Sequence, residues 1–258
     1  MLIEPLVRQL HDLRLRGMAA ALEAQLRSHD NHALSFEERL GLLIEHEVAE
    51  RTNYRLGQRL RWARLPLPSA CLEDIEARTP RGIDPVTFAA VRDLSWIKKR
   101  LNVLVTGPCG IGKSFLASAL AQGACRADYS VRCFRLPRLA EELARAHALQ
   151  RRSALLRQIA KANVLLIDDF GLTPMTDTLA RDLLEILDDR YEKSSTIVTS
   201  QLEVEHWHGY LGDATVADAI LDRLVHNAYR LSLKGESRRK NKGLNANACN
   251  AKWMSLPA

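Results

Sequence analysis

The stretch LNVLVTGPCGIGKS, residues 101–114, decides the fold of this 258-residue chain. It opens with a short, mostly apolar run that is long enough for a buried strand. Thr106, Gly107 and Pro108 then interrupt that run, so the chain must turn there. Good helix formers follow from Phe115 to Gln122. The order predicts a strand, a glycine-rich loop and a helix.

The loop fits the pattern G-x-x-x-x-G-K-[ST], with Gly107, Gly112, Lys113 and Ser114 in the defining places. In such a P-loop the glycines let backbone amides converge on a phosphate, and the helix aims its partial positive charge at the same anion. We expect Lys113 to reach the β- and γ-phosphates and Ser114 to hold Mg²⁺. The alternative is a glycine-rich turn that binds nothing. The predicted nucleotide-binding residues of this stretch are Gly107, Pro108, Cys109, Gly110, Ile111, Gly112, Lys113, Ser114 and Phe115.

Two acids follow a second apolar run in NVLLIDDFG, residues 163–171. A buried parallel strand that ends in carboxylates at the ligand crevice is typical of a Walker B motif. We expect Asp168 to bind Mg²⁺, and Asp169 to orient or deprotonate the attacking water. The alternative is that the two acids only begin a turn.

A further strand, STIVTSQ at 195–201, has a polar tip. If this strand lies beside the P-loop strand in a parallel sheet, Gln201 points at the γ-phosphate and reports its presence. The alternative is a polar residue that starts a turn. Other expected elements are a strand at 130–136, helices at 138–150, 176–193 and 219–229, and a last strand at 230–234. Strands that alternate with helices predict an α/β fold with a parallel sheet flanked by helices.

The first 64 residues follow a helical pattern, with a break expected near Gly17. Ser35 and Glu38 form a capping-box signature for a helix that runs to about Arg64. The two prolines of LPLPS, 65–69, end it. We therefore expect a small all-helical domain at 1–66, an α/β domain at 67–240 and a flexible basic tail at 241–258.

The formal net charge is +6, which permits a nucleic-acid partner. Arg51, Arg55 and Arg59 recur every four residues and line one helix face, and no acid occurs from 51 to 64. A cationic face with aromatic neighbours suits a phosphate backbone. The alternative is a solvated face, or arginines paired with acids elsewhere. The predicted DNA-binding residues are Arg51, Arg55, Arg59, Arg61 and Arg64.

The composition also argues against several classes of protein. No run approaches the roughly 18 apolar residues of a membrane span, and the first residues lack a continuous apolar stretch, so a secretory signal is not indicated. We expect a cytoplasmic protein without a membrane partner. The five cysteines are scattered without a C-x-x-C pair, which indicates neither a disulfide framework nor a zinc site.

Taken in order, the motifs GPCGIGKS, LLIDDFGL, STIVTSQ, ILDRLVHNAYRL and LKGESRRK resemble those of the AAA+ ATPases. Within that group the chain looks most like the IstB-type helper proteins of bacterial insertion sequences, which are related to the DnaC-type helicase loaders. The resemblance covers nearly the whole chain. It implies an AAA+ ATPase domain at 67–240. The chain departs from the usual AAA+ pattern after Gln201, where few residues follow, so we expect the C-terminal lid to be reduced or absent.

The resemblance also implies a function. An ATP-dependent protein of this kind forms homo-oligomers on duplex DNA, remodels that DNA and recruits a transposase, and hydrolysis of ATP with Mg²⁺ controls the assembly. It implies sensor I for Gln201, an arginine finger for Arg223 and a sensor II-like contact for Arg239, with Arg238 as the alternative. Arg223 is otherwise an exposed helical charge paired with Asp222 or Glu185.

Asp169 stands where many AAA+ enzymes have Glu, so we expect slow turnover, stimulated by DNA or a partner. A helicase loader remains the nearest alternative function, because the residues hardly distinguish the two partners. A small-molecule P-loop kinase would need an acceptor pocket and would make no use of the cationic helix face. A pure adaptor with a structural nucleotide would not need both carboxylates.

Overall fold

A computed structural model describes residues 3–27, 34–76 and 82–235. The chain divides into two compact units, Met1–Arg61 and Trp62–Ala258. Arg238, Arg239 and the expected tail at 241–258 lie outside the described residues.

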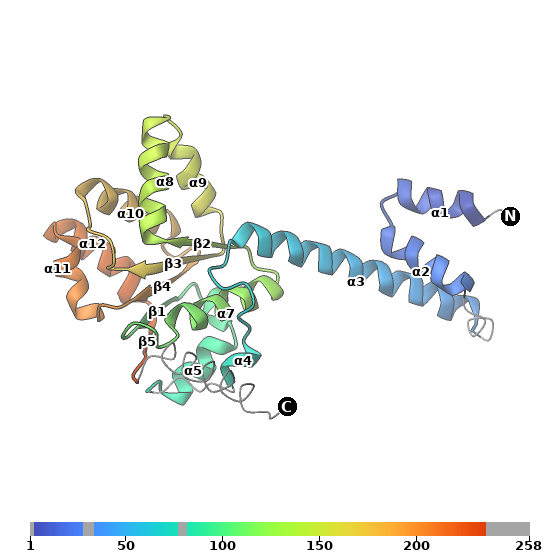
Figure 1. The fold of residues 1–258 in the computed structure, drawn as a ribbon, viewed down its shortest axis with the longest axis horizontal. Coiled ribbons are helices and arrows are strands. Elements are labelled where there is room, and N and C mark those ends of the chain that lie inside the picture. The colour runs from blue at the N-terminus through green and yellow to red at the C-terminus, as the bar shows by residue number, and fades with distance from the viewer. Residues whose placement is uncertain (1–2, 28–33, 77–81, 236–258) are drawn as a thin grey trace, which may run out of the picture. The chain divides into compact units, whose positions relative to one another are not determined.

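The first unit is helical, with α1 (Ile3–Asp12), α2 (Arg16–Arg27) and α3, which begins at Phe36 and ends at Ala63 (Figure 1). The predicted capping box is present at the start of α3. Ser35 N donates to Glu38 Oε2 at 2.7 Å, and Glu38 N donates to Ser35 Oγ at 3.2 Å. Arg64 follows the helix with φ +53°, so α3 ends just before the two prolines, as predicted.

The helix break predicted near Gly17 is present between Asp12 and Arg16, and Gly17 itself is the second residue of α2. A Cβ atom at Gly17 would lie 2.7 Å from both Glu47 Cα and His46 O, so only glycine allows α2 to approach α3 this closely. Glu47 Oε2 also accepts hydrogen bonds from the amides of Gly17 at 2.8 Å and Met18 at 3.1 Å.

The second unit contains a five-stranded parallel sheet in the order β2-β3-β4-β1-β5 (Figure 1). The parallel sheet flanked by helices confirms the predicted fold class, and β4 lies beside β1, as the interpretation of Gln201 requires. The strands are β1 (Asn102–Thr106), β2 (Val131–Arg135), β3 (Val164–Phe170), β4 (Ser195–Ser200) and β5 (Ala228–Ser232).

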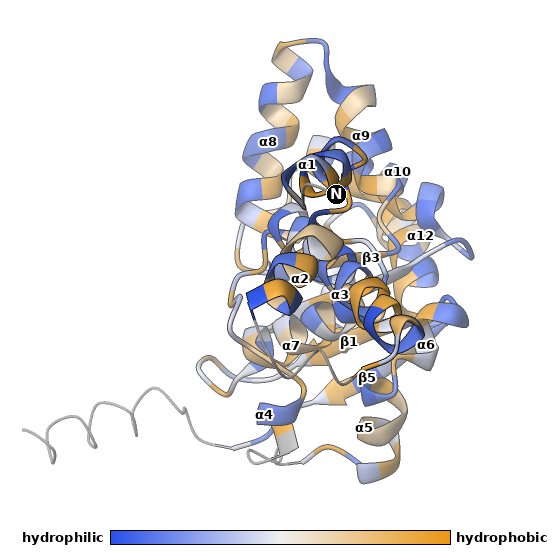
Figure 2. Ribbon diagram, turned by 90° about the vertical axis from the view of Figure 1, so that its right-hand side faces the viewer, coloured by the Kyte–Doolittle hydropathy of each residue, from blue (hydrophilic) through white to orange (hydrophobic). Residues whose placement is uncertain are grey.

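Helices cover both faces of this sheet. The core on one face contains Leu104, Leu165 and Val198 from the strands, together with leucines and isoleucines of α8, α10 and α12. Side chains alternate along a strand, and α7 lies against the opposite face (Figure 1). Helices α8 and α9 carry both hydrophilic and hydrophobic residues, as expected for helices with one buried side (Figure 2). These helices are α7 (Lys113–Arg126), α8 (Leu136–Ala148), α9 (Arg152–Ala160), α10 (Asp177–Arg190) and α12 (Ala214–Val225).

Shorter helices complete this unit: α4 (Glu73–Glu76), α5 (Pro85–Arg92), α6 (Ser95–Lys98) and α11 (Trp207–Leu211), with a 3₁₀ turn at Val204–His206. None of the helices within the described ranges combines the length and apolar character needed to cross a bilayer.

The helix and strand expected near the C-terminus both begin earlier than predicted. Asp213 caps α12 by accepting a hydrogen bond from Val216 N at 2.9 Å, so the helix starts at Ala214 rather than at 219. The last strand starts at Ala228 rather than at 230, because Asn102 N donates to Asn227 O at 2.8 Å and pairs β5 with β1 from that point.

Arg190, on α10, is 1% exposed and connects two elements of the second unit. Its guanidinium donates to the carbonyls of Ile159 in α9 (3.0 Å) and of Ala162 just after α9 (2.7 Å), and to Ser195 O in β4 (2.5 Å). Burial lowers the pKa of Arg190 to about 9. The guanidinium thereby links the carbonyls at the end of α9 to the first residue of β4.

Candidate nucleotide-binding site

The P-loop begins where β1 ends, and its glycines are required by its geometry. Gly107, Gly110 and Gly112 have φ values of +137°, +80° and +113°. A Cβ atom at Gly107 would come within 2.3 Å of Leu233 O, in the segment after β5, whereas a Cβ atom at Gly112 would meet no atom within 4 Å. The space beside Gly112, at the first turn of α7, is open for an anion.

Lys113 lies inside the loop. Its Nζ donates to the carbonyls of Gly107 at 2.7 Å and Pro108 at 2.9 Å, and the residue is buried. A positive charge is therefore held among the loop residues that phosphates would contact. Around it, Cys109 and Pro108 are exposed, Ile111 is buried and Phe115 is half-buried in the first turn of α7.

Ser114 and Asp168 meet although they are 54 residues apart. Ser114 Oγ donates to Asp168 Oδ1 at 2.9 Å, and Asp168 is 3% exposed. A hydroxyl and a carboxylate oxygen in contact are the kind of donor set that protein Mg²⁺ sites use. The two residues predicted to hold the metal therefore fit a Mg²⁺ ion bound to phosphates.

Thr199 on β4 connects the two Walker B acids, and no sequence motif pointed to this residue. Its Oγ1 donates to Asp168 Oδ1 at 2.5 Å and accepts a hydrogen bond from Asp169 N at 3.1 Å. The threonine is 1% exposed. Its position could have been found only from the pairing of β3 with β4.

Asp169 lies in an irregular part of β3. Its φ is +61°, and the register of β3 against β4 shifts between Ile167 and Phe170. Arg135, the last residue of β2, donates to Asp169 Oδ2 from Nε at 2.9 Å and from Nη2 at 2.6 Å. These hydrogen bonds raise the pKa of Arg135 above its ordinary value. Arg135 was also missed, because its partner lies on a different strand.

Gln201 directly follows β4, which lies between β1 and β3 in the sheet. Its exposed side chain thus starts between the P-loop strand and the Walker B strand. Two residues on, Glu203 Oε2 accepts a hydrogen bond from Thr106 Oγ1 at 2.7 Å, which fixes this loop to the end of β1. This position is compatible with a contact to the γ-phosphate, and that role stays a prediction.

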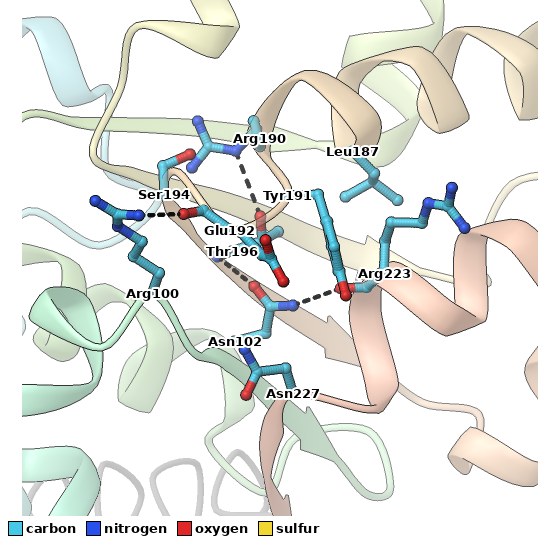
Figure 3. A pocket seen from close by; sticks show the side chains of 10 residues that line it. All are labelled: Arg100, Asn102, Leu187, Arg190, Tyr191, Glu192, Ser194, Thr196, Arg223 and Asn227. Atoms are coloured by element: carbon cyan, nitrogen blue, oxygen red, sulfur yellow. Dashed lines mark hydrogen bonds between the residues drawn. The ribbon is translucent and has the colours of Figure 1, made fainter.

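Arg223 lies at the other end of the sheet. Asn102, the first residue of β1, donates from Nδ2 to Arg223 O at 2.8 Å (Figure 3). The guanidinium pairs with Asp188 at 2.7 Å and Asp222 at 3.2 Å. The alternative partner Asp222 is therefore present, whereas Glu185 pairs with Arg152. The structure does not bring Arg223 to its own P-loop.

The arginines of α3 differ in their surroundings. Arg51, Arg55 and Arg59 follow one another at single-turn spacing, and Arg51 Nε pairs with Glu47 Oε1 at 2.6 Å. Residues i and i+2 of a helix point about 200° apart, so Arg61 is on a different side of α3 from Arg59. The Nε atom of Arg61 donates to Gly57 O at 3.3 Å. Arg61 does not extend the cationic face. Beyond the helix, Arg64 Nη1 lies 3.7 Å from Glu142 Oε1, so these two side chains form an ion pair.

Comparison with known proteins identifies the family. The family model of the IstB-like ATP-binding proteins matches residues 8–246. The chain belongs to this family. Among relatives, the chain is 45% identical over 241 residues to the insertion sequence ATP-binding protein y4pL of Sinorhizobium fredii, covering 93% of this chain and 98% of the relative. It is 34% identical over 230 residues to the insertion sequence IS21 ATP-binding protein of Pseudomonas aeruginosa, covering 89% and 86%.

Solved structures share the fold of this IstB-like protein. The crystal structure of DnaI matches with a TM-score of 0.53 at 22% identity, covering 64% of this chain and 92% of that one. The AMPPCP-bound DnaA of Aquifex aeolicus matches with a TM-score of 0.53 at 14% identity, covering 74% and 57%. The predicted IstB-type resemblance and AAA+ fold are thereby confirmed.

Proposed function

We propose that this IstB-like protein is a cytoplasmic, ATP-dependent helper of transposition. In this proposal ATP and Mg²⁺ drive its copies to assemble on duplex DNA, the assembly remodels the target DNA and recruits the transposase, and slow hydrolysis, stimulated by DNA or a partner, releases or reorganises it. The observation that carries the ATP-dependent part is the contact between Ser114 and Asp168 beside a buried Lys113. The family of insertion sequence ATP-binding proteins supplies the transposition context.

The residues divide the chemistry of hydrolysis among them. The amides of the P-loop and Lys113 bind the phosphates. Ser114 and Asp168 would hold Mg²⁺, which neutralises developing phosphate charge. Asp169 orients or deprotonates the attacking water. Both hydrogen bonds from Arg135 go to Asp169 Oδ2, so Oδ1 is the oxygen that we assign to the water. Gln201 is the proposed sensor of the γ-phosphate, and Arg239, with Arg238 as the alternative, is the proposed sensor II residue.

Assembly on DNA tests this function most directly. With ATP, Mg²⁺ and a duplex, we expect light scattering to report particles much larger than a protomer, and Lys113→Ala to abolish them. Lys161→Ala is the matched control, because Lys161 is exposed and follows α9 rather than the P-loop. A wild-type protein that stays monomeric under these conditions contradicts the proposal. Retention of a helicase in place of the transposase in a pull-down would favour a helicase loader.

The cationic face of α3 is proposed to contact the DNA backbone. Each phosphate contact that is lost should lower the slope of log K against log salt by about one. We therefore expect Arg55→Ala or Arg59→Ala to lower the salt slope of duplex binding, and Arg61→Ala to lower it less because Arg61 points to another side. Equal slopes for all three variants and the wild type would place the DNA elsewhere.

A further inference from the structure

Arg223 is fixed far from the nucleotide site of its own protomer. The side chain of Asn102 donates to Arg223 O at 2.8 Å and to Leu224 O at 3.2 Å, so the end of α12 is attached to the start of β1. The P-loop begins after the last residue of β1. Five residues of strand span roughly 16 Å, which is longer than an arginine side chain. Arg223 can therefore reach a triphosphate only if a second copy of the chain presents one.

The guanidinium of Arg223 already has partners within its own protomer. Its Nε donates to Asp188 Oδ1 at 2.7 Å, and its Nη1 donates to Asp222 Oδ2 at 3.2 Å and to Ala219 O at 3.3 Å. The guanidinium carbon lies 5.9 Å from the centre of the Tyr191 ring. These contacts raise the pKa of Arg223, with the hydrogen bond to Asp188 as the main cause. The cation is held at a defined place on the surface.

The ion pairs of Arg223 with Asp188 and Asp222 are accessible to solvent. The side chains of Arg223, Asp188 and Asp222 are 32%, 48% and 52% exposed. Arg223 also lines two neighbouring hollows, one at the amino-terminal end of the sheet (Figure 3) and a wider one along α12. An incoming protomer can thus approach the guanidinium without unfolding any element.

We propose that Asp188 is a positioning residue that competes with the γ-phosphate of a second copy for Arg223. The proposal rests on the proposed role of Arg223 as an arginine finger. A planar guanidinium can bind a carboxylate or phosphate through two pairs of donors, Nε with Nη2 or Nη1 with Nη2. Asp188 accepts from Nε of the first pair, and Asp222 and Ala219 O accept from Nη1 of the second. Bidentate binding of a phosphate through the Nε pair therefore requires that Asp188 be released. The carboxylate keeps the finger withdrawn in an isolated protomer and raises the protein concentration at which hydrolysis becomes half-maximal.

Removal of the competing charge should favour assembly. Exposed ion pairs shift equilibria only modestly, so we expect Asp188→Asn to lower the protein concentration for half-maximal ATP turnover by about two- to fivefold. The experiment measures turnover per protomer against protein concentration, with saturating ATP, Mg²⁺ and duplex DNA. Asp188→Glu, which keeps a carboxylate, should behave like the wild type. Raising the salt concentration should shrink the difference between Asp188→Asn and the wild type.

Asp189→Asn is the matched control. It removes the same charge one residue away on α10, so it accounts for a general gain in DNA affinity from the higher net charge. An unchanged or higher half-maximal concentration for Asp188→Asn, or an equal shift in Asp189→Asn, would refute the competition. A merely structural role would instead lower the thermal unfolding temperature of Asp188→Asn and its turnover at every concentration, and that result also refutes it.

Arg223→Ala separates this inference from the proposed function. If Arg223→Ala hydrolyses ATP like the wild type, the finger role is wrong and the competition is wrong with it. If Arg223→Ala loses turnover and Asp188→Asn shows no shift, only the competition is wrong. Loss in the first variant with a lower half-maximal concentration in the second supports both.

Discussion

Thr199 determines how the two acids of the Walker B strand are held. Its hydroxyl donates to Asp168 Oδ1 and accepts from Asp169 N, and Ser114 donates to the same oxygen of Asp168. A single buried hydroxyl therefore orders both the proposed metal ligand and the residue proposed to act on water.

Replacement of Thr199 by valine, a side chain of nearly the same shape, should impair ATP hydrolysis. A hydrogen bond to a charged group contributes about 1.5–3 kcal/mol, so we expect a tenfold or larger fall in ATP turnover and a higher Mg²⁺ requirement. A Mg²⁺ titration of the ATPase measures both. Thr199→Ser keeps the hydroxyl and should retain most activity; if serine and valine are equally impaired, the hydrogen bonds are not the reason.

Two P-loop glycines should respond differently to alanine. Both have positive φ, which costs an alanine about 1–3 kcal/mol. At Gly107 the new Cβ would also lie 2.3 Å from Leu233 O, whereas at Gly112 nothing lies within 4 Å. We expect Gly107→Ala to lower the free energy of unfolding clearly more than Gly112→Ala, as measured by chemical denaturation. An equal loss of unfolding free energy in the two variants would mean that Leu233, after β5, moves away from the new Cβ atom at little cost.

At the residue scale the sequence was informative where a motif is contiguous. Lys113 and Ser114 follow from the P-loop pattern, and Asp168 from the end of an apolar run. Thr199 and Arg135 could not be found in the same way, because they contact the acids across strands, and the sequence does not say which strands are neighbours or in which register.

At the scale of elements, helix α2 depends on a carboxylate from another helix. Glu47 on α3 accepts hydrogen bonds from the first amides of α2 and from Arg51. Burial alone raises the pKa of Glu47, but the hydrogen bonds from Arg51, Met18 and Gly17 outweigh it and lower the pKa below its ordinary value of 4.5. The carboxylate thus supports the packing of α2 on α3 in its ionised form.

The lowered pKa of Glu47 determines how the stability of the α2–α3 packing depends on pH. A group whose pKa is lower in the folded state contributes stability above its unfolded pKa, and this contribution is lost as the pH falls through the folded value. We expect hydrogen exchange to show falling protection of the Gly17 and Met18 amides as the pH drops below about 4.5. Glu47→Gln should lack this step and start from lower protection at neutral pH. A wild-type protein whose amides stay protected at pH 3 would contradict the assignment.

Element boundaries were predictable where the chain carries its own stop signal. The capping box at Ser35 and the prolines after Arg64 set both ends of α3 correctly. Helix α9 was missed because no glycine or proline separates it from α8; the turn between them is made by Gln150, with φ +54°. The start of α12 was misplaced because its cap, Asp213, precedes the apolar pattern by several residues.

At the scale of the whole molecule, the two ends of the parallel sheet carry different chemistry. The P-loop and the Walker B acids lie at the carboxyl end, whereas Arg223 is fixed at the amino end by Asn102. Their separation follows from the parallel pairing of β5 with β1, because Arg223 precedes β5 whereas the P-loop follows β1. A contact that joins unlike ends of two copies is head-to-tail, so it continues into a ring or a helical filament.

The separation predicts complementation between two inactive variants. Lys113→Ala should bind no triphosphate but still offer Arg223, and Arg223→Ala should bind ATP but lack the finger, a loss of about 10³ to 10⁵ in rate. Although Lys113→Ala alone does not assemble, it can still present its finger to the ATP-loaded site of an Arg223→Ala protomer. At most about one interface in four of an equal mixture pairs an intact site with an intact finger. We therefore expect measurable turnover of up to about a quarter of the wild-type value from the mixture, and almost none from either variant alone. Arg223→Ala mixed with a Lys113→Ala/Arg223→Ala double variant is the control, because the double variant offers no guanidinium to its neighbour and that mixture should stay inactive. A mixture that remains as inactive as its components would show that Arg223 does not act on a second copy.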